Sequence, residues 1–237
     1  METTMNHSAA QPRRSRRSAR LATAIGAGLV GAGVLLTPAV AFADTAQTVQ
    51  TTDRAGDARA GLVNNKAADL LTAGARIDSS TVTAFFGLNA PPTAADLAGT
   101  GTYRYTTQLS DSGYPGITVA FSNTDAALYP TIDDPQAMLE PSAACVAYFG
   151  PQAGAGLHGT VTSNAATGEL TTTFSKADVN AAVSCYTSPP SSDPLSAGHE
   201  VGVTSATSHV QPAVRNPLIG AAIAQDSAGA GPVVTLN

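Results

Sequence analysis

The chain of 237 residues has 12 basic and 17 acidic side chains and a net charge of −5. An acidic chain repels phosphate backbones and anionic lipid headgroups, so we expect neither a nucleic-acid partner nor an anionic membrane surface as its target. The chain is rich in Ala, Gly and Thr, and together with its Arg-rich start this composition is typical of a bacterium with a GC-rich genome.

Residues 1–43 have the order of parts of a secretory signal peptide. Five arginines between positions 13 and 20 precede an apolar stretch at 21–40, and an A-x-A motif ends at Ala43 before Asp44. An uncleaved anchor is the alternative, because about 20 apolar residues can span a bilayer. We favour cleavage between Ala43 and Asp44, after export through Sec or the twin-arginine route. The expected location is the cell envelope or the outside of the cell.

Cleavage would leave an acidic chain of one ordinary domain with extra segments. The segment removes five Arg and one Glu, which leaves 7 basic and 16 acidic residues and a net charge of −9. No later stretch is long and apolar enough to span a membrane. The partner we expect is therefore an unidentified envelope or extracellular molecule.

Two cysteines, Cys145 and Cys185, remain after cleavage. An even number of cysteines in an exported chain favours a disulfide. Closing a loop of about 41 residues would stabilise the fold by about 4 kcal/mol in the chain-entropy model. A catalytic thiol is the alternative, and it would leave the other cysteine unpaired.

The first half of the domain shows helical spacing. Residues 44–52 are polar, and we expect a mobile linker there. Asp53 can cap a helix that runs to about Ala73, because Val, Ala and Leu recur at helical spacing within it. A second helix can begin at Ser79 or Ser80 and end at Gly87, and the proline-containing stretch 88–101 is typical of a loop.

From residue 102 onward the period changes to two. Residues 102–109 and 117–122 alternate and predict a hairpin. Tyr103 and Tyr105 share one face of it, either as a ligand platform or, as we favour, as cover for the core. A second hairpin is predicted for 157–162 and 169–174, joined by the loop SNAATG. In it His158 lies on the polar face with Thr160 and Thr162.

The rest of the chain predicts short elements and then a tail. Asp134-Pro135 can open a short helix, and residues 143–149 are ambiguous between helix and strand. Ser175 and Asp178 stand in the spacing of a capping box for a helix with its apolar residues inward. Residues 188–237, rich in Ser, Pro, Gly and Ala, predict a mostly extended or disordered tail.

The predicted fold class is α+β. We expect a small antiparallel sheet of about four or five strands in a domain at 53–187, with an N-terminal helix and a short late helix on one face, followed by an irregular C-terminal tail.

One motif resembles that of a known family. His158-Gly159-Thr160, followed downstream by Ser184-Cys185, resembles part of the signature of the L,D-transpeptidases, exported enzymes that cross-link peptidoglycan through a catalytic cysteine. The resemblance implies that Cys185 is the nucleophile and that His158 lines the site. The chain departs from the family motif, which has His and Gly between Ser and Cys and an Arg soon after. Without a neighbouring base, the thiol of Cys185 would stay protonated.

Other site motifs are lacking in the sequence. There is no G-x-S-x-G or H-E-x-x-H, and neither G-x-G-x-x-G nor a P-loop stands before a predicted helix and after a predicted strand. His199 and His209 fall in the expected tail. Asp133, Asp134 and Glu140 lack the spacing of a calcium loop. We expect no catalytic residue, cofactor or metal, and interpret the chain as a non-catalytic binding or structural module. A cell-wall cysteine enzyme and an oligomeric envelope pore subunit remain the alternatives.

Overall fold

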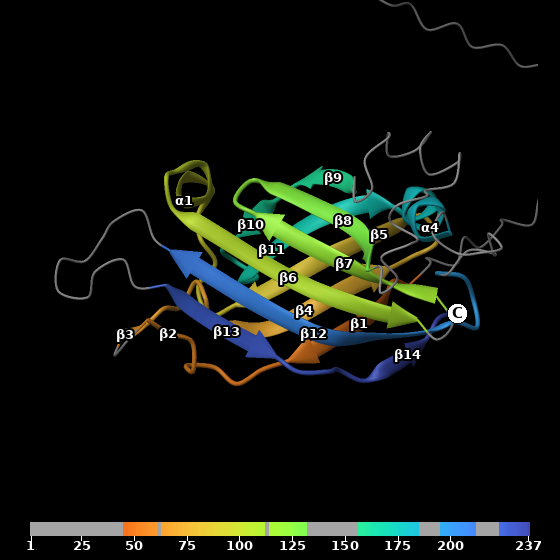
Figure 1. Cartoon of the computed structure of the whole chain (residues 1–237), viewed down its shortest axis with the longest axis horizontal. Coiled ribbons are helices and arrows are strands. Elements are labelled where there is room, and N and C mark those ends of the chain that lie inside the picture. Colours follow the sequence, from red (N-terminus) through yellow and green to blue (C-terminus); the bar gives the residue numbers. More distant parts are fainter. Residues whose placement is uncertain (1–44, 61–62, 112–113, 132–155, 185–194, 212–222) are drawn as a thin grey trace, which may run out of the picture. The chain divides into compact units, whose positions relative to one another are not determined.

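The computed structural model describes residues 45–60, 63–111, 114–131, 156–184, 195–211 and 223–237 (Figure 1). These residues form fourteen strands and two short helices. The elements are β1 (Gln47–Thr52), β2 (Arg59–Ala60), β3 (Val63–Asn64), β4 (Leu70–Ile77), β5 (Thr81–Leu88), α1 (Ala94–Ala98), β6 (Thr102–Asp111), β7 (Tyr114–Ser122), β8 (Asp125–Thr131), β9 (Leu157–Thr160), β10 (Thr162–Asn164), β11 (Glu169–Ser175), α4 (Lys176–Ser184), β12 (Glu200–Gln211), β13 (Ala224–Ala228) and β14 (Val233–Thr235).

The strands make two antiparallel sheets. The smaller sheet has five strands in the order β1-β4-β5-β11-β10. The larger sheet has nine strands. Eight of them follow the order β3-β2-β13-β12-β6-β7-β8-β9, and the ninth, β14, pairs with β12 outside this order. In Figure 1 the blue strand β12 lies between the darker blue β13 and the yellow-green β6, and the green β7 follows β6, as the pairing requires.

A single apolar core joins the two sheets. Phe86 of β5 contacts aromatic rings of the larger sheet, with centroid distances of 5.6 Å to Tyr105 and 4.9 Å to Phe121. The hydroxyl of Tyr105 donates to the carbonyl of Ala67 at 2.7 Å, which satisfies its one polar group inside the core. The fold is therefore a two-layer β-sandwich.

The prediction of an α+β fold with a small sheet and an N-terminal helix is wrong. Residues 53–73 contain β2, β3 and the start of β4, and the second predicted helix is β5. In β4, Ala73 and Ala75 are fully buried, and Gly74 lies so close to β1 that a Cβ there would overlap the carbonyl of Val49. The alanines, which favour a helix locally, and the glycine are used here for close packing between strands, because tertiary contacts override propensity.

The edge strand β1 occupies the place of the expected mobile linker. Gln47–Thr52 pairs along its length with β4, and Val49 is fully buried. The hydroxyl of Thr51 donates to the carbonyl of Gly229 at 2.7 Å, so the C-terminal part of the chain also contacts this strand.

The prediction of an irregular C-terminal tail is also wrong for the described residues. Glu200–Gln211 forms β12, which pairs with β6, β13 and β14, and Leu236 is buried. A register shift between Val203 and Ser205 interrupts the two-residue period, and two of the inward residues after it are Ala206 and Ser208. The sequence pattern is weak because of this bulge and because small and polar residues point inward.

The first predicted hairpin is confirmed and the second is confirmed in part. β6 pairs with β7, and Tyr103 and Tyr105 are buried, so they cover the core rather than a ligand. In the second, β10 pairs with β11, but β9 pairs with β8 of the other sheet. The chain changes sheets at Val161, which is buried.

The predicted late helix is confirmed as α4. The backbone N–H of Asp178 donates to the hydroxyl of Ser175 at 3.4 Å, and Val179, Ala182 and Val183 are fully buried. A short helix that was not predicted, α1, begins after Thr93 with a complete capping box to Asp96. The predictions for Asp134-Pro135 and residues 143–149 fall outside the described residues. In the described part of the chain, no helix has the length and apolar character needed to cross a bilayer.

Candidate functional site

The structure does not describe the predicted disulfide or the predicted cleavage site. Cys145, Cys185, Ala43 and Asp44 all lie outside the described residues. The disulfide and the cleavage therefore stay predictions. Asp133, Asp134 and Glu140 also lie outside that part of the chain.

His158 lies on β9 with its side chain 65% exposed. Its Nδ1 is 3.3 Å from Oδ2 of Asp125 on the paired strand β8. Thr160 and Thr162 are exposed as well, so the predicted polar, solvent-facing position of His158 is confirmed.

We expected His199 and His209 in an irregular tail. Instead, His209 lies in a strand of the larger sheet and His199 lies directly before that strand. His199 precedes β12, and its Nδ1 is 2.8 Å from Oδ2 of Asp111 at the end of β6; these side chains are 22% and 6% exposed. His209 lies within β12, where it pairs with Arg104 of β6 on one side and Gln225 of β13 on the other.

An open groove lies over the adjacent strands β12 and β13. Its lining residues are Thr207, Ser208, His209, Gln225, Asp226 and Ser227. Successive side chains of a strand point to opposite faces. Ser208 is buried and its hydroxyl donates to the carbonyl of Ala68, whereas Gln225 and Ser227 are exposed. The outward side chains of the groove are therefore those of Thr207, His209, Gln225 and Ser227.

The hydrogen bond between His209 and Gln225 sets the tautomer of the imidazole. Nε2 of Gln225 lies 3.1 Å from Nδ1 of His209. An amide nitrogen only donates, so Nδ1 accepts and the neutral ring carries its proton on Nε2. The groove thus offers an N–H donor from His209 beside hydroxyl groups of Thr207 and Ser227.

The sheet register extends this polar face in a row across the larger sheet. His209 is opposite Arg104, Arg104 is opposite Ser122, and Ser122 is opposite Asp125. Arg104, Ser122 and Asp125 are exposed. Residues directly opposite on one face have Cβ atoms about 4.5–5.5 Å apart, so Arg104 lies beside His209, next to the residues that line the groove.

A group of three carboxylates lies beside the same strand, β13. Asp53, Asp57 and Asp226 each place an oxygen within 4.8 Å of the others. Asp226 accepts from the backbone N–H of Leu70 and of Ser227, both at 2.8 Å. Burial, followed by the charges of Asp57 and Asp53, raises the pKa of Asp226 above its usual range.

Carboxylate oxygens are ligands for hard cations such as Ca²⁺, and Asp53, Asp57 and Asp226 are the described residues that could hold one. The three residues bring one oxygen each into the cluster, whereas Ca²⁺ takes six to eight oxygen ligands, so second carboxylate oxygens, backbone carbonyls or water would have to complete the coordination. Sequence reasoning missed this group, because Asp226 is far along the chain from the other two and no motif spacing links them. Asp53 was expected to cap a helix; instead its backbone N–H donates to the carbonyl of Leu71 at 3.0 Å.

Comparison with known proteins does not place the chain in a family. No family model, no curated protein and no solved structure matches it.

Proposed function

We propose that this chain is an exported bacterial protein of the cell envelope or the extracellular space, and that it acts as a non-catalytic binding module. The observation that carries the proposal is the groove over β12 and β13, in which polar side chains of two paired strands lie side by side. Strands of a sandwich hold such side chains in fixed positions, which lowers the entropy lost when a ligand binds. The signal peptide ending at Ala43 and the disulfide between Cys145 and Cys185 are parts of the proposal.

Co-sedimentation of the purified chain with cell-wall sacculi tests the binding function. We expect the chain to sediment with the sacculi, and we expect His209→Ala and Gln225→Ala to reduce the bound fraction. Thr83→Ala is the matched control, because Thr83 lies on β5 of the other sheet and is paired through its hydroxyl with Thr173 at 3.0 Å. Equal binding by all variants, or no binding, contradicts the proposal.

An enzymatic role is tested on the same preparation. Incubation with cell-wall peptides should produce no cleavage or cross-linking, and thiol titration of the exported chain should find no free thiol. Turnover that is lost in Cys185→Ala would contradict the non-catalytic proposal. Two free thiols would contradict the disulfide.

A further inference from the structure

We propose that the groove over β12 and β13 binds the carboxylate group of a small ligand, with Arg104 and His209 as its main donors. This inference rests on the proposed binding function and names the chemical class of the ligand. Its first basis is position: Arg104 is directly opposite His209, which is directly opposite Gln225, so three donor-bearing side chains lie in one row across three strands.

The second basis is the hydrogen-bonding state of these groups. In the described part of the chain, the guanidinium of Arg104 makes no hydrogen bond or ion pair, and its side chain is exposed. The Nδ1 of His209 is occupied by Gln225, so its Nε2–H is directed to other acceptors. An arginine fork and an N–H donor side by side match the oxygens of a carboxylate, which arginine binds through two parallel hydrogen bonds.

The carboxylates near the row do not occupy these donors. Asp125 lies two strands from Arg104 in sheet order, separated from it by Ser122, and is 3.3 Å from His158. Asp226 lies on β13 between the outward residues Gln225 and Ser227. Its side chain accepts from the backbone of Leu70, which belongs to the other sheet. The three residues of the row, Gln225, His209 and Arg104, therefore carry no negative charge, although the whole chain is acidic.

The test is an NMR titration of the ¹⁵N-labelled chain with four probes. Glucuronate and N-acetylalanine carry a carboxylate on a sugar and on an amino acid, and glucose and N-acetylalanine amide are their uncharged counterparts. We expect the carboxylates, and not the uncharged probes, to shift the backbone amides of residues 207–209 and 225–227. Tighter binding of glucuronate would indicate a sugar acid as the natural ligand, and tighter binding of N-acetylalanine would indicate the carboxylate end of a peptide.

Two variants and a control test Arg104 as a donor. Arg104→Gln should weaken carboxylate binding about tenfold or more, because it removes a charge-assisted pair of hydrogen bonds. Arg104→Lys should bind with intermediate strength, since it keeps the charge and loses the fork. Lys176→Gln, which makes the same charge change at the start of α4, should bind like the original chain. The spectrum itself shows whether each variant is folded.

The outcomes separate this inference from the proposed function. If sacculi bind in a manner that depends on His209 but neither carboxylate shifts the groove, the ligand class is wrong and the binding function stands. If the carboxylates shift the groove but sacculi do not bind, the ligand class stands and the envelope function fails. Shifts that are the same in Arg104→Gln and the original chain overturn the inference.

Discussion

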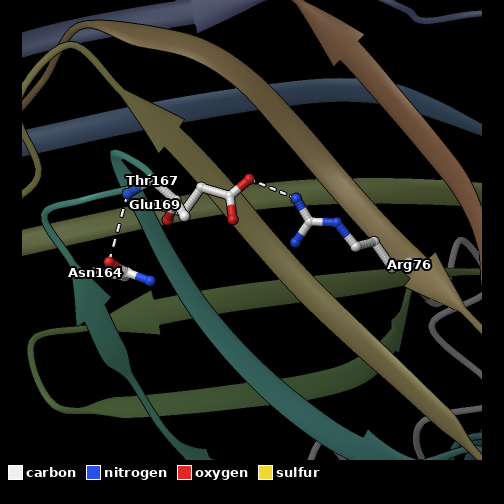
Figure 2. A network of polar contacts seen from close by, with 4 residues as sticks. All are labelled: Arg76, Asn164, Thr167 and Glu169. Carbon is white, nitrogen blue, oxygen red and sulfur yellow. Dashed lines mark hydrogen bonds and ion pairs between the residues drawn. The ribbon is translucent and has the colours of Figure 1, made fainter.

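Arg76 lies over the ring of Phe85, with its guanidinium carbon 4.1 Å from the ring centroid. Phe85 is 1% exposed, yet it is not part of the core between the sheets, where the adjacent Phe86 lies. The guanidinium also pairs with the carboxylate of Glu169 on β11, as Figure 2 shows. Thus Arg76 covers an aromatic ring on the outer face of the smaller sheet, and Glu169 holds Arg76 in place.

Arg76→Ala should destabilise the fold more than Glu169→Gln. The ion pair is partly exposed, at 36% and 20%, so its loss should cost about 0.2–1 kcal/mol. Loss of the Arg76 side chain also uncovers the ring, which adds about 0.5–1 kcal/mol. Urea unfolding measures both, and Arg76→Met, which keeps an apolar cover, should resemble Glu169→Gln. Equal effects of Arg76→Ala and Arg76→Met would show that the cover is unimportant.

Phe86→Ala should be among the most damaging single changes in the chain. Its ring contacts Tyr105 and Phe121 of the opposite sheet, so truncation leaves a cavity between the layers. The expected loss in free energy of unfolding is about 3–5 kcal/mol. Val233→Ala is the control: Val233 is 63% exposed and its truncation should change stability by less than about 0.5 kcal/mol. A loss below about 1 kcal/mol for Phe86→Ala would contradict the packing described.

Asn123→Ala should destabilise the turn between β7 and β8 more than Asn123→Gly does. Asn123 has a φ of 55°, where glycine is unstrained and alanine costs about 1 kcal/mol more. Both changes remove the amide bonds to the carbonyls of Leu97 and Gly101 and the bond from the N–H of Tyr103. Chemical denaturation measures the difference. Equal stability of the two variants would show that the backbone strain is negligible.

Gly231→Ala tests whether the C-terminal segment is packed on β1. A Cβ at Gly231 would overlap the carbonyl of Gln50, and the N–H of Gly231 donates to Val203 at 2.9 Å. We expect a loss of about 1–3 kcal/mol, because the backbone must shift. Gly229→Ala is the control, since a Cβ there would meet nothing within 4 Å. If the two variants unfold alike, residues 229–231 are not held against β1.

The pKa of Asp78 should lie below the ordinary range of a carboxyl group and the pKa of Asp226 above it. Carboxyl chemical shifts followed by NMR as a function of pH measure both values. Hydrogen bonds from Thr81 and Ser80 lower the pKa of Asp78 to about 2. Its stabilising contribution is therefore complete above the ordinary carboxyl range and is lost as pH falls toward about 2. Asp78→Asn should remove that part of the acid sensitivity.

The raised pKa of Asp226 has the reverse effect. The folded chain binds the proton of Asp226 more tightly than the unfolded chain, so stability falls as pH rises from about 4 through the raised folded value. In Asp226→Asn the stability curve should fall less over this range. A steeper fall in the variant, or a pKa of the Asp226 carboxyl below the ordinary range, would contradict the burial of Asp226 first and its proximity to Asp57 and Asp53 second.

The parts of the fold that the sequence predicted are those with regular local patterns. The alternation of large apolar and polar residues in 102–122 predicts a hairpin, and the capping residues Ser175 and Asp178 predict α4. The same reasoning fails where inward positions hold small residues, as in β4, or where a bulge changes the phase, as in β12. The groove was missed because no sequence motif links His209 and Gln225, which are brought together only by the pairing of β12 with β13.

The sequence by itself determined the acidic charge, which follows from composition. It also determined the hairpin of β6 and β7, the late helix and the exposed position of His158, because each of these depends on residues that are close together in the chain. Tertiary structure alone decided that an Ala- and Gly-rich segment would be a central strand, and that residues 200–211 would join the larger sheet. It also decided that Arg104, His209 and Gln225 would form one row. These outcomes depend on pairing between distant segments, and the free energy of burying two sheets against each other outweighs the local preferences of either.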